Sequence, residues 1–204
     1  MSPLVFLPGA SGSRNFWQAL IAELNLTDHY HIVAYPGFDG VEAQPNIQNL
    51  DDLRHQISQN LPDQSILIAQ SMGGVLAVGM ALEQPEKFSA LVLMATSGGI
   101  DFQDFQCVDW RTDYAQHFPE APDWFVRDQT QYQAEQLAKL NMPVLLLWGD
   151  QDPLSSVAVG QSLQRMLPHA SLHVVAGGDH FFAAHSAQVI APIIQHFFAN
   201  LEQK

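Results

Sequence analysis

The chain has 204 residues, of which 47% are hydrophobic and 14% are charged. This composition excludes a disordered chain and favours a single folded domain over residues 1–204. The formal net charge of −13 would repel phosphate backbones and anionic headgroups, so we expect neither a nucleic acid nor a membrane as a partner.

The start of the chain and its one cysteine concern the compartment in which the protein works. No basic region precedes the short apolar run at the N-terminus, unlike in a secretory signal peptide. No run of about 18 apolar residues could span a bilayer. Cys107 is the single cysteine, so an intrachain disulfide is excluded. We therefore expect a cytoplasmic protein.

Short apolar runs alternate with amphipathic segments along most of the chain. Each run is brief and is followed by Gly, Pro, Ser or Asp, which is typical of parallel strands that are covered on both faces. The expected strands are 4–6, 32–35, 66–69, 91–95, 144–148 and 172–175. Strands that alternate with helices imply an open parallel sheet, which binds ligands at the carboxyl ends of its strands.

Apolar residues at helical spacing predict the helices between these strands. The expected helices include 16–24 and 47–61, and a last one covers 189–201. Pro192 lies within the last pattern, so we expect either a kink or a helix that starts near Ala191.

The segment 99–138 departs from this alternation. It has no strand pattern, and Pro119 and Pro122 interrupt it. It is too long for an ordinary loop, so we expect an insertion with helices of its own. Its aromatic residues are Phe102, Phe105, Trp110, Tyr114, Phe118, Trp124, Phe125 and Tyr132.

Ser71 carries the strongest chemical signal. It lies in Ala69-Gln70-Ser71-Met72-Gly73-Gly74, between a strand pattern and a helical pattern. A serine on a sharp strand-to-helix turn projects its hydroxyl above the sheet edge, and small residues two positions before and after it permit the strained turn. Ser71 is therefore the candidate nucleophile. The alternative is a serine that only caps the helix.

A serine nucleophile needs a base, and the base needs an acid that orients it. On a sheet of this kind the expected chain order is serine, acid, histidine. His180 follows the last expected strand after a glycine turn, which makes it the candidate base. Asp150 and Asp152 both follow the preceding strand, and either could be the acid.

These motifs, in this order, resemble those of the α/β-hydrolase superfamily. The Ser71 turn resembles its nucleophile elbow, and the stretch Pro8-Gly9-Ala10-Ser11-Gly12 resembles its oxyanion loop. The stretches Gly149-Asp150-Gln151-Asp152 and Gly178-Asp179-His180 resemble its acid turn and its histidine turn. The resemblance implies Asp152 as the acid, with Asp150 as the second choice.

The same resemblance implies that the backbone N–H groups of Ala10 and Met72 form the oxyanion hole. Two residues depart from the pattern: Pro8 stands where the family usually has histidine, and Ala69 stands where it has the first elbow glycine. The chain begins at the oxyanion strand, without the two leading strands that are common in the family. We therefore expect a six-stranded, all-parallel α/β-hydrolase sheet with helices on both faces and a short helical cap at about 99–138.

The activity that the resemblance implies is that of a serine hydrolase. It would cleave a small-molecule carboxylic ester or thioester through an acyl-enzyme intermediate, with no cofactor and no metal. The alternatives are a carbon–carbon bond hydrolase or lyase on the same scaffold, such as the menaquinone-pathway synthase type, and a non-catalytic binding protein.

Several aromatic residues are candidates for an apolar acyl pocket. Their alternative role is to pack the insertion onto the body of the protein. The scarcity of basic residues favours a neutral ester, although Arg111, Arg127 and Lys139 could contact an anionic group. The candidate pocket residues are Trp110, Trp124, Phe125 and Phe181.

Overall fold

A single sheet organises the protein. The computed structural model describes residues 2–101, 105 and 107–203, so Phe102 lies outside the described residues. The strands have the order β2-β1-β3-β4-β5-β6, and every neighbouring pair is parallel. This confirms the six-stranded, all-parallel sheet. The strands are β1 (Leu4–Leu7), β2 (Tyr30–Ile32), β3 (Ser65–Gln70), β4 (Phe88–Met94), β5 (Val144–Gly149) and β6 (Ala170–Val175).

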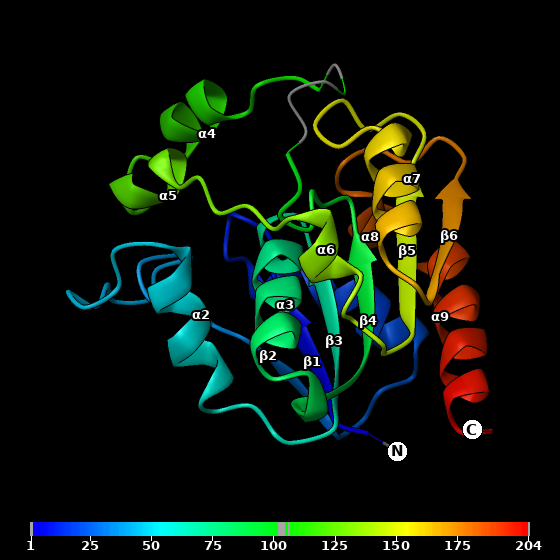
Figure 1. Cartoon of the computed structure of the whole chain (residues 1–204). Coiled ribbons are helices and arrows are strands. Elements are labelled where there is room, and N and C mark those ends of the chain that lie inside the picture. The colour runs from blue at the N-terminus through cyan, green and yellow to red at the C-terminus, as the bar shows by residue number, and fades with distance from the viewer. Residues whose placement is uncertain (1, 102–104, 106, 204) are drawn as a thin grey trace.

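Helices cover both faces of the sheet (Figure 1). One face carries η1 (Arg14–Trp17), α1 (Gln18–Glu23), α8 (Phe182–His185) and α9 (Ala187–Leu201). The other face carries α2 (Leu50–Ser58), α3 (Met72–Glu83) and α7 (Val157–Met166). A short turn of helix, η2 (Pro85–Lys87), joins α3 to β4.

The two hydrophobic cores follow from the alternation of side chains along each strand. In β1, Val5 and Leu7 pack in the core under α2, α3 and α7, whereas Leu4 and Phe6 pack in the core under α1 and α9. A strand that is covered on both faces must be apolar at nearly every position. All residues of β3 and β5 are buried, and for this reason the central strands read as continuous apolar runs.

Several element boundaries differ from the prediction, and two of these differences have a structural explanation. Strand β2 ends at Ile32, where the pattern placed a strand over 32–35, because β2 lies at the sheet edge and its exposed residues Tyr30 and His31 carry no apolar signal. The helix start near Ala191 is wrong, since α9 already begins at Ala187 and contains Pro192. Pro192 cannot donate to the Gln188 carbonyl, but Gln188 is exposed, so water can reach that carbonyl.

The segment between β4 and β5 forms the expected helical insertion. Its described helices are α4 (Arg111–His117), α5 (Asp123–Arg127) and α6 (Ala134–Leu137). Helices α4 and α5 lie beyond the carboxyl ends of the strands (Figure 1). Phe125 lies among Trp110, Tyr114 and Phe38 with ring centroids 5.1, 5.2 and 5.9 Å away. The insertion is therefore anchored on the body by an aromatic cluster.

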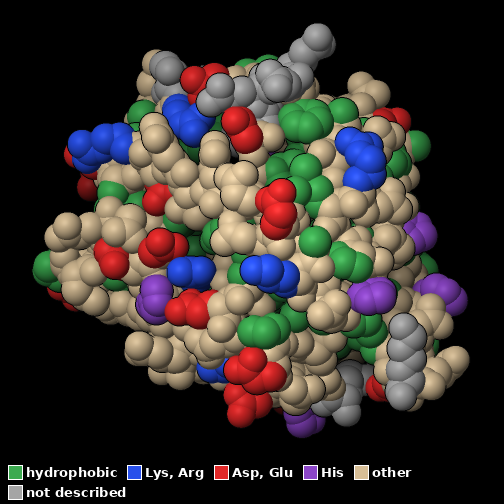
Figure 2. Space-filling view, viewed as in Figure 1, with side chains coloured by type: hydrophobic (Ala, Val, Ile, Leu, Met, Phe, Trp, Pro, Cys, Tyr) green, Lys and Arg blue, Asp and Glu red, His purple; other side chains and the backbone are tan. Residues whose placement is uncertain are grey.

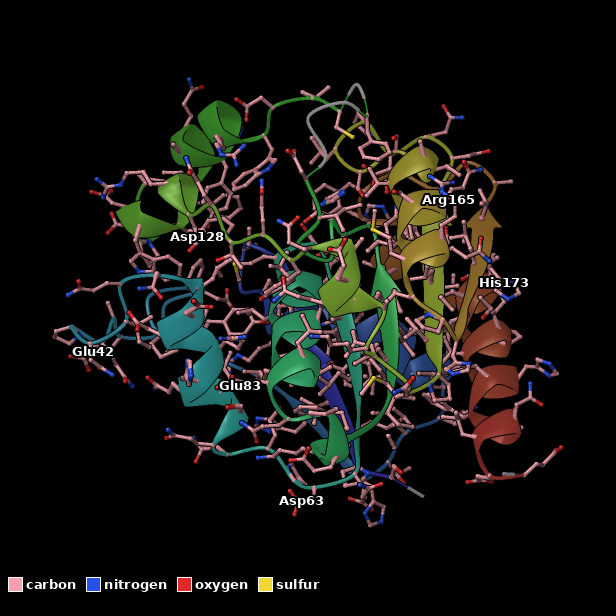
Figure 3. All side chains as sticks on the ribbon, viewed as in Figure 1. Glu42, Asp63, Glu83, Asp128, Arg165 and His173 are labelled. Atoms are coloured by element: carbon pink, nitrogen blue, oxygen red, sulfur yellow. The ribbon has the colours of Figure 1, made fainter. Side chains whose placement is uncertain are left out.

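A polar contact joins the insertion to α2. The Asp128 carboxylate accepts hydrogen bonds from the backbone N–H of Leu50 at 3.0 Å and from that of Thr130 at 2.8 Å. Leu50 is the first residue of α2, so Asp128 satisfies a donor that has no partner within the helix. Figure 3 shows Asp128 between the insertion and α2.

The surface carries charges of both signs. On the face shown in Figure 2, acidic and basic side chains are interspersed, and the described Lys and Arg side chains form no continuous basic area there. In the part of the chain that the structure describes, no helix is long and apolar enough to cross a bilayer.

Candidate active site

Ser71 occupies the sharp turn between β3 and α3. Its backbone has φ +53° and ψ −119°, a conformation that costs a non-glycine residue about 1–3 kcal/mol and persists only where its surroundings hold it. Its N–H donates to the Met94 carbonyl at 3.0 Å, and its carbonyl accepts from the Gly74 N–H at 2.9 Å and the Thr96 hydroxyl at 2.6 Å. The strained serine is therefore held from the carboxyl end of the neighbouring strand β4 and from its own helix.

The glycines after Ser71 allow α3 to start close to its neighbours. A Cβ on Gly73 would lie 2.6 Å from the Pro8 carbonyl oxygen, and a Cβ on Gly74 would lie 2.5 Å from the Thr96 hydroxyl oxygen. Both distances are too short for a real side chain. The small residues of the motif thus serve the close packing of α3 against β1 and the end of β4.

Three side chains from three strand ends meet at this turn. Ser71 follows β3, Asp152 follows β5 and His180 follows β6. The Nε2 atom of His180 lies 3.1 Å from the Ser71 Oγ, and its Nδ1 atom lies 2.9 and 3.1 Å from the two carboxylate oxygens of Asp152. The hydrogen-bond pattern assigns the ring proton to Nδ1, which leaves Nε2 to accept from the serine hydroxyl.

The structure places Asp152, and not Asp150, beside His180. The Asp152 side chain is fully shielded from solvent, and its Oδ1 also accepts from the N–H groups of Leu154 at 2.8 Å and Ser155 at 3.0 Å. Asp150 is exposed and accepts from the Gly177 N–H at 2.7 Å, so it holds the two strand-end turns together.

Gln70 is a supporting residue that the sequence reasoning missed. Its side-chain amide donates to the His180 carbonyl at 3.1 Å, so it fixes the backbone that carries the imidazole. Thr96, which holds the Ser71 carbonyl, was also missed. Gln70 ends β3 directly before Ser71, and Thr96 follows the end of β4, so a polar residue at the carboxyl end of a buried strand was the available signal.

The loop after β1 brings Ala10 to the same place. A Cβ on Gly9 would lie 3.3 Å from the Ser71 Cβ, so this loop runs directly beside the serine. Ala10 and Met72 both border the cavity described below. Among the described residues, neither of their N–H groups donates a hydrogen bond within the protein, so both are free to bind an oxygen atom of a ligand.

A cavity of about 840 Å³ opens in front of Ser71 and His180. Trp110 and Phe125 of the insertion line it, as does Phe181, which is 50% exposed. Trp124 is absent from the lining and packs against Phe38 at 6.0 Å instead. The cavity is therefore walled by the insertion on one side and by the strand-end loops on the other.

Of the three basic residues that could contact an anionic group, only one lines the cavity. Arg111 lines the cavity, with its guanidinium 3.5 Å from Asp109 and 5.1 Å above the Trp110 ring. Arg127 and Lys139 do not line it. Over residues 2–101, 105 and 107–203, no group of three or more His, Cys, Asp or Glu side chains is arranged to hold a metal ion.

Comparison with known proteins identifies the family. Residues 4–192 match the alpha/beta hydrolase family model, so the chain belongs to that family of hydrolases. It is 28% identical over 237 residues to a pimeloyl-(acyl-carrier protein) methyl ester esterase of Salmonella typhi, a match that covers 95% of this chain and 88% of that protein.

Solved structures show the same fold. The chain superposes with a TM-score of 0.83 on a protein of Acinetobacter baumannii AYE that is inferred to be a lipase, at 20% identity and over 99% of this chain and 85% of that one. The TM-score with a meta-cleavage product hydrolase of Pseudomonas fluorescens IP01 is 0.78, at 18% identity and over 98% and 91% of the two chains. At these identities the two matches establish the fold alone.

Proposed function

We propose that the protein is a serine hydrolase that cleaves a small-molecule carboxylic ester through an acyl-enzyme intermediate. The observation that carries the proposal is the continuous hydrogen-bond path from Ser71 through His180 to the buried Asp152, at the edge of a cavity. A serine, a base and an orienting acid in this arrangement are what nucleophilic acyl transfer requires.

The first half of the reaction acylates the serine. His180 Nε2 takes the hydroxyl proton as the Ser71 Oγ attacks the ester carbonyl carbon, and Asp152 stabilises the imidazolium that forms. The imidazolium then gives this proton to the leaving alkoxide, so an alcohol departs. In the second half, His180 takes a proton from water, the hydroxide attacks the acyl carbon, and Ser71 recovers its proton as the carboxylic acid leaves.

Negative charge develops on the carbonyl oxygen in both halves. The N–H groups of Ala10 and Met72 would receive it, because both border the cavity and have no acceptor of their own among the described residues. Loss of one such donor typically lowers kcat by about 10²–10³-fold. The N-terminus of α3, where Met72 lies, adds a favourable dipole.

The cavity supports a neutral ester with an apolar portion. Trp110, Phe125 and Phe181 offer apolar surface, and the charge of Arg111 is compensated by Asp109. The Salmonella relative is named for the hydrolysis of a methyl ester, which supports an oxygen ester over a thioester.

Labelling with a fluorophosphonate tests the proposal first. The probe should modify Ser71, as located by peptide mass spectrometry, and His180→Ala should abolish both labelling and the hydrolysis of p-nitrophenyl esters. His185→Ala is the matched control, because His185 is exposed and lies 3.6 Å from Asp179, outside the hydrogen-bond path. Folded protein that is neither labelled nor active on esters would contradict the proposal and favour a binding protein. Turnover of vinylogous diketones without ester turnover would favour carbon–carbon cleavage.

A further inference from the structure

Three consecutive carbonyls of the loop after β1 each accept a hydrogen bond. The Pro8 carbonyl accepts from the Tyr35 hydroxyl at 3.0 Å, and the Gly9 carbonyl accepts from the Gly12 N–H at 2.9 Å. The Ala10 carbonyl accepts from the Tyr114 hydroxyl at 2.6 Å. Two of the three donors are tyrosine side chains from distant parts of the chain.

The two tyrosines come from different elements of the fold. Tyr35 follows β2 and is completely buried, whereas Tyr114 belongs to α4 of the insertion and is 8% exposed. The ring of Tyr114 stacks on Phe118 with centroids 4.9 Å apart and meets Phe125 at 5.2 Å, so the aromatic cluster fixes the direction of its hydroxyl. Burial raises the pKa of both hydroxyls above the ordinary tyrosine value, which keeps them protonated donors.

These contacts constrain one peptide group in particular. The Ala10 N–H belongs to the peptide group that joins Gly9 to Ala10, and the peptide groups on either side carry the carbonyls that the tyrosines hold. A peptide plane is rigid, so its direction is set by the torsions at the two residues it joins. Gly9 has no Cβ to restrict these torsions, and a Cβ there would strike the Gln70 side chain. The Gly9 carbonyl of this peptide group is held by the Gly12 N–H within the loop, and the two tyrosines restrain the peptide groups on either side from outside the loop.

We propose that Tyr114 is a positioning residue for the oxyanion hole: its hydroxyl holds the Ala10 carbonyl and thereby keeps the Ala10 N–H directed at the oxygen of the reacting group. The inference rests on the proposed function, because the Ala10 N–H matters only if a carbonyl is attacked at Ser71. It gives the insertion a second task. Besides lining the cavity, the insertion holds the part of the body that stabilises the transition state.

Tyr114→Phe is the decisive variant, since it removes the hydroxyl and keeps the ring that lines the cavity. We expect kcat for a p-nitrophenyl ester to fall about tenfold with KM within about twofold, which is less than the effect of losing an oxyanion donor outright. Tyr35→Phe removes the donor on the other side of the loop without touching the cavity lining, and it should lower kcat in the same way.

Tyr132→Phe is the matched control. Tyr132 also belongs to the insertion segment, and its hydroxyl donates to a backbone carbonyl, that of Val75 in α3 at 3.5 Å. It does not line the cavity, and its hydroxyl donates to α3 and not to the oxyanion loop. Its variant should therefore keep the wild-type kcat, and thermal unfolding measured on all three variants separates loss of fold from loss of positioning.

Inhibitor binding provides a readout that a merely structural role would not change. A trifluoromethyl ketone forms a hemiketal with an activated serine, in which the former carbonyl oxygen becomes an oxyanion in the hole. Its affinity should fall in Tyr114→Phe by the same factor as kcat/KM, while the affinity for the product acid stays unchanged. Wild-type-like kcat and hemiketal affinity in Tyr114→Phe would overturn the inference while leaving the proposed function intact. Failure of the wild-type protein to label at Ser71 would instead remove the proposed function, and the inference with it.

Discussion

Asp152→Asn is the substitution whose consequence the geometry determines most closely. Asp152 Oδ1 accepts from the N–H groups of Leu154 and Ser155, so an asparagine would keep its amide oxygen there. The NH₂ group would then replace Oδ2, which lies 2.9 Å from His180 Nδ1. Because an NH₂ group can only donate, Nδ1 would have to accept, and the ring proton would move to Nε2.

In that tautomer His180 Nε2 already carries a proton. It therefore cannot accept the proton of the Ser71 hydroxyl, as the reaction requires. We therefore expect kcat of Asp152→Asn to fall about 10⁴-fold with little change in stability, since the side-chain shape and the two backbone hydrogen bonds are kept. The assay is steady-state hydrolysis of a p-nitrophenyl ester, combined with the rate of fluorophosphonate labelling at Ser71.

Asp150→Asn is the matched control for this variant. Asp150 is exposed, and an asparagine oxygen can still accept from the Gly177 N–H, so kcat should stay within about twofold of wild type. The reasoning would be refuted by an Asp152→Asn enzyme within tenfold of wild type, or by a larger loss in Asp150→Asn than in Asp152→Asn.

Three further predictions concern stability. Ser71→Gly should raise the free energy of unfolding by about 1 kcal/mol relative to Ser71→Ala in urea titrations, because glycine relieves the positive φ; equal stabilities would argue against strain at this residue. Gly74→Ala should lower stability by about 1–3 kcal/mol, visible as a lower Tm, because its Cβ would lie 2.5 Å from the Thr96 hydroxyl oxygen; an unchanged Tm would show that the turn can relax. Burial raises the pKa of Tyr132 from 10.0 to about 12. Between these two values the folded protein keeps a proton that the unfolded chain loses. The stability that this proton contributes is complete below pH 10, and it should decline as the pH rises towards 12. Tyr132→Phe should make the decline of Tm over this pH range shallower, and an identical slope would contradict the assignment.

The sheet could be predicted from the sequence because its central strands are buried on both faces. A strand such as β5, buried at all its positions, has to be apolar throughout and is visible in one sequence. Strand β2 was misplaced for the opposite reason: it is an edge strand with exposed Tyr30 and His31, and the apolar Val33 that follows is buried in a loop. An apolar run indicates which residues are buried. At the edge of a sheet, the buried residues are not always the ones that form the strand.

The choice between Asp150 and Asp152 depends on atoms that a sequence does not place. Both aspartates follow β5, and both accept backbone hydrogen bonds in the turn. What separates them is the approach of Gly177 and Gly178 from β6, which ties Asp150 to a backbone N–H and leaves Asp152 facing the histidine. The position of the two aspartates after β5 made both of them candidates for the acid. The contact between the turn after β5 and the turn after β6 decides which of them faces the histidine.

The insertion was the least predictable part, and the reason bears on how the site works. An aromatic residue in a sequence indicates a ring that can pack against others, but not which backbone group its polar atom will reach. Tyr114 donates to Ala10 across 104 positions of the chain, and Asp128 accepts from Leu50 across 78. The partners are backbone groups, which leave no trace in residue identity. These two hydrogen bonds, together with the aromatic cluster around Phe125, hold the short cap to the loop after β1 and to α2. Under the proposed function, the insertion therefore supports the loop that would bind the oxyanion, and it also forms one wall of the cavity.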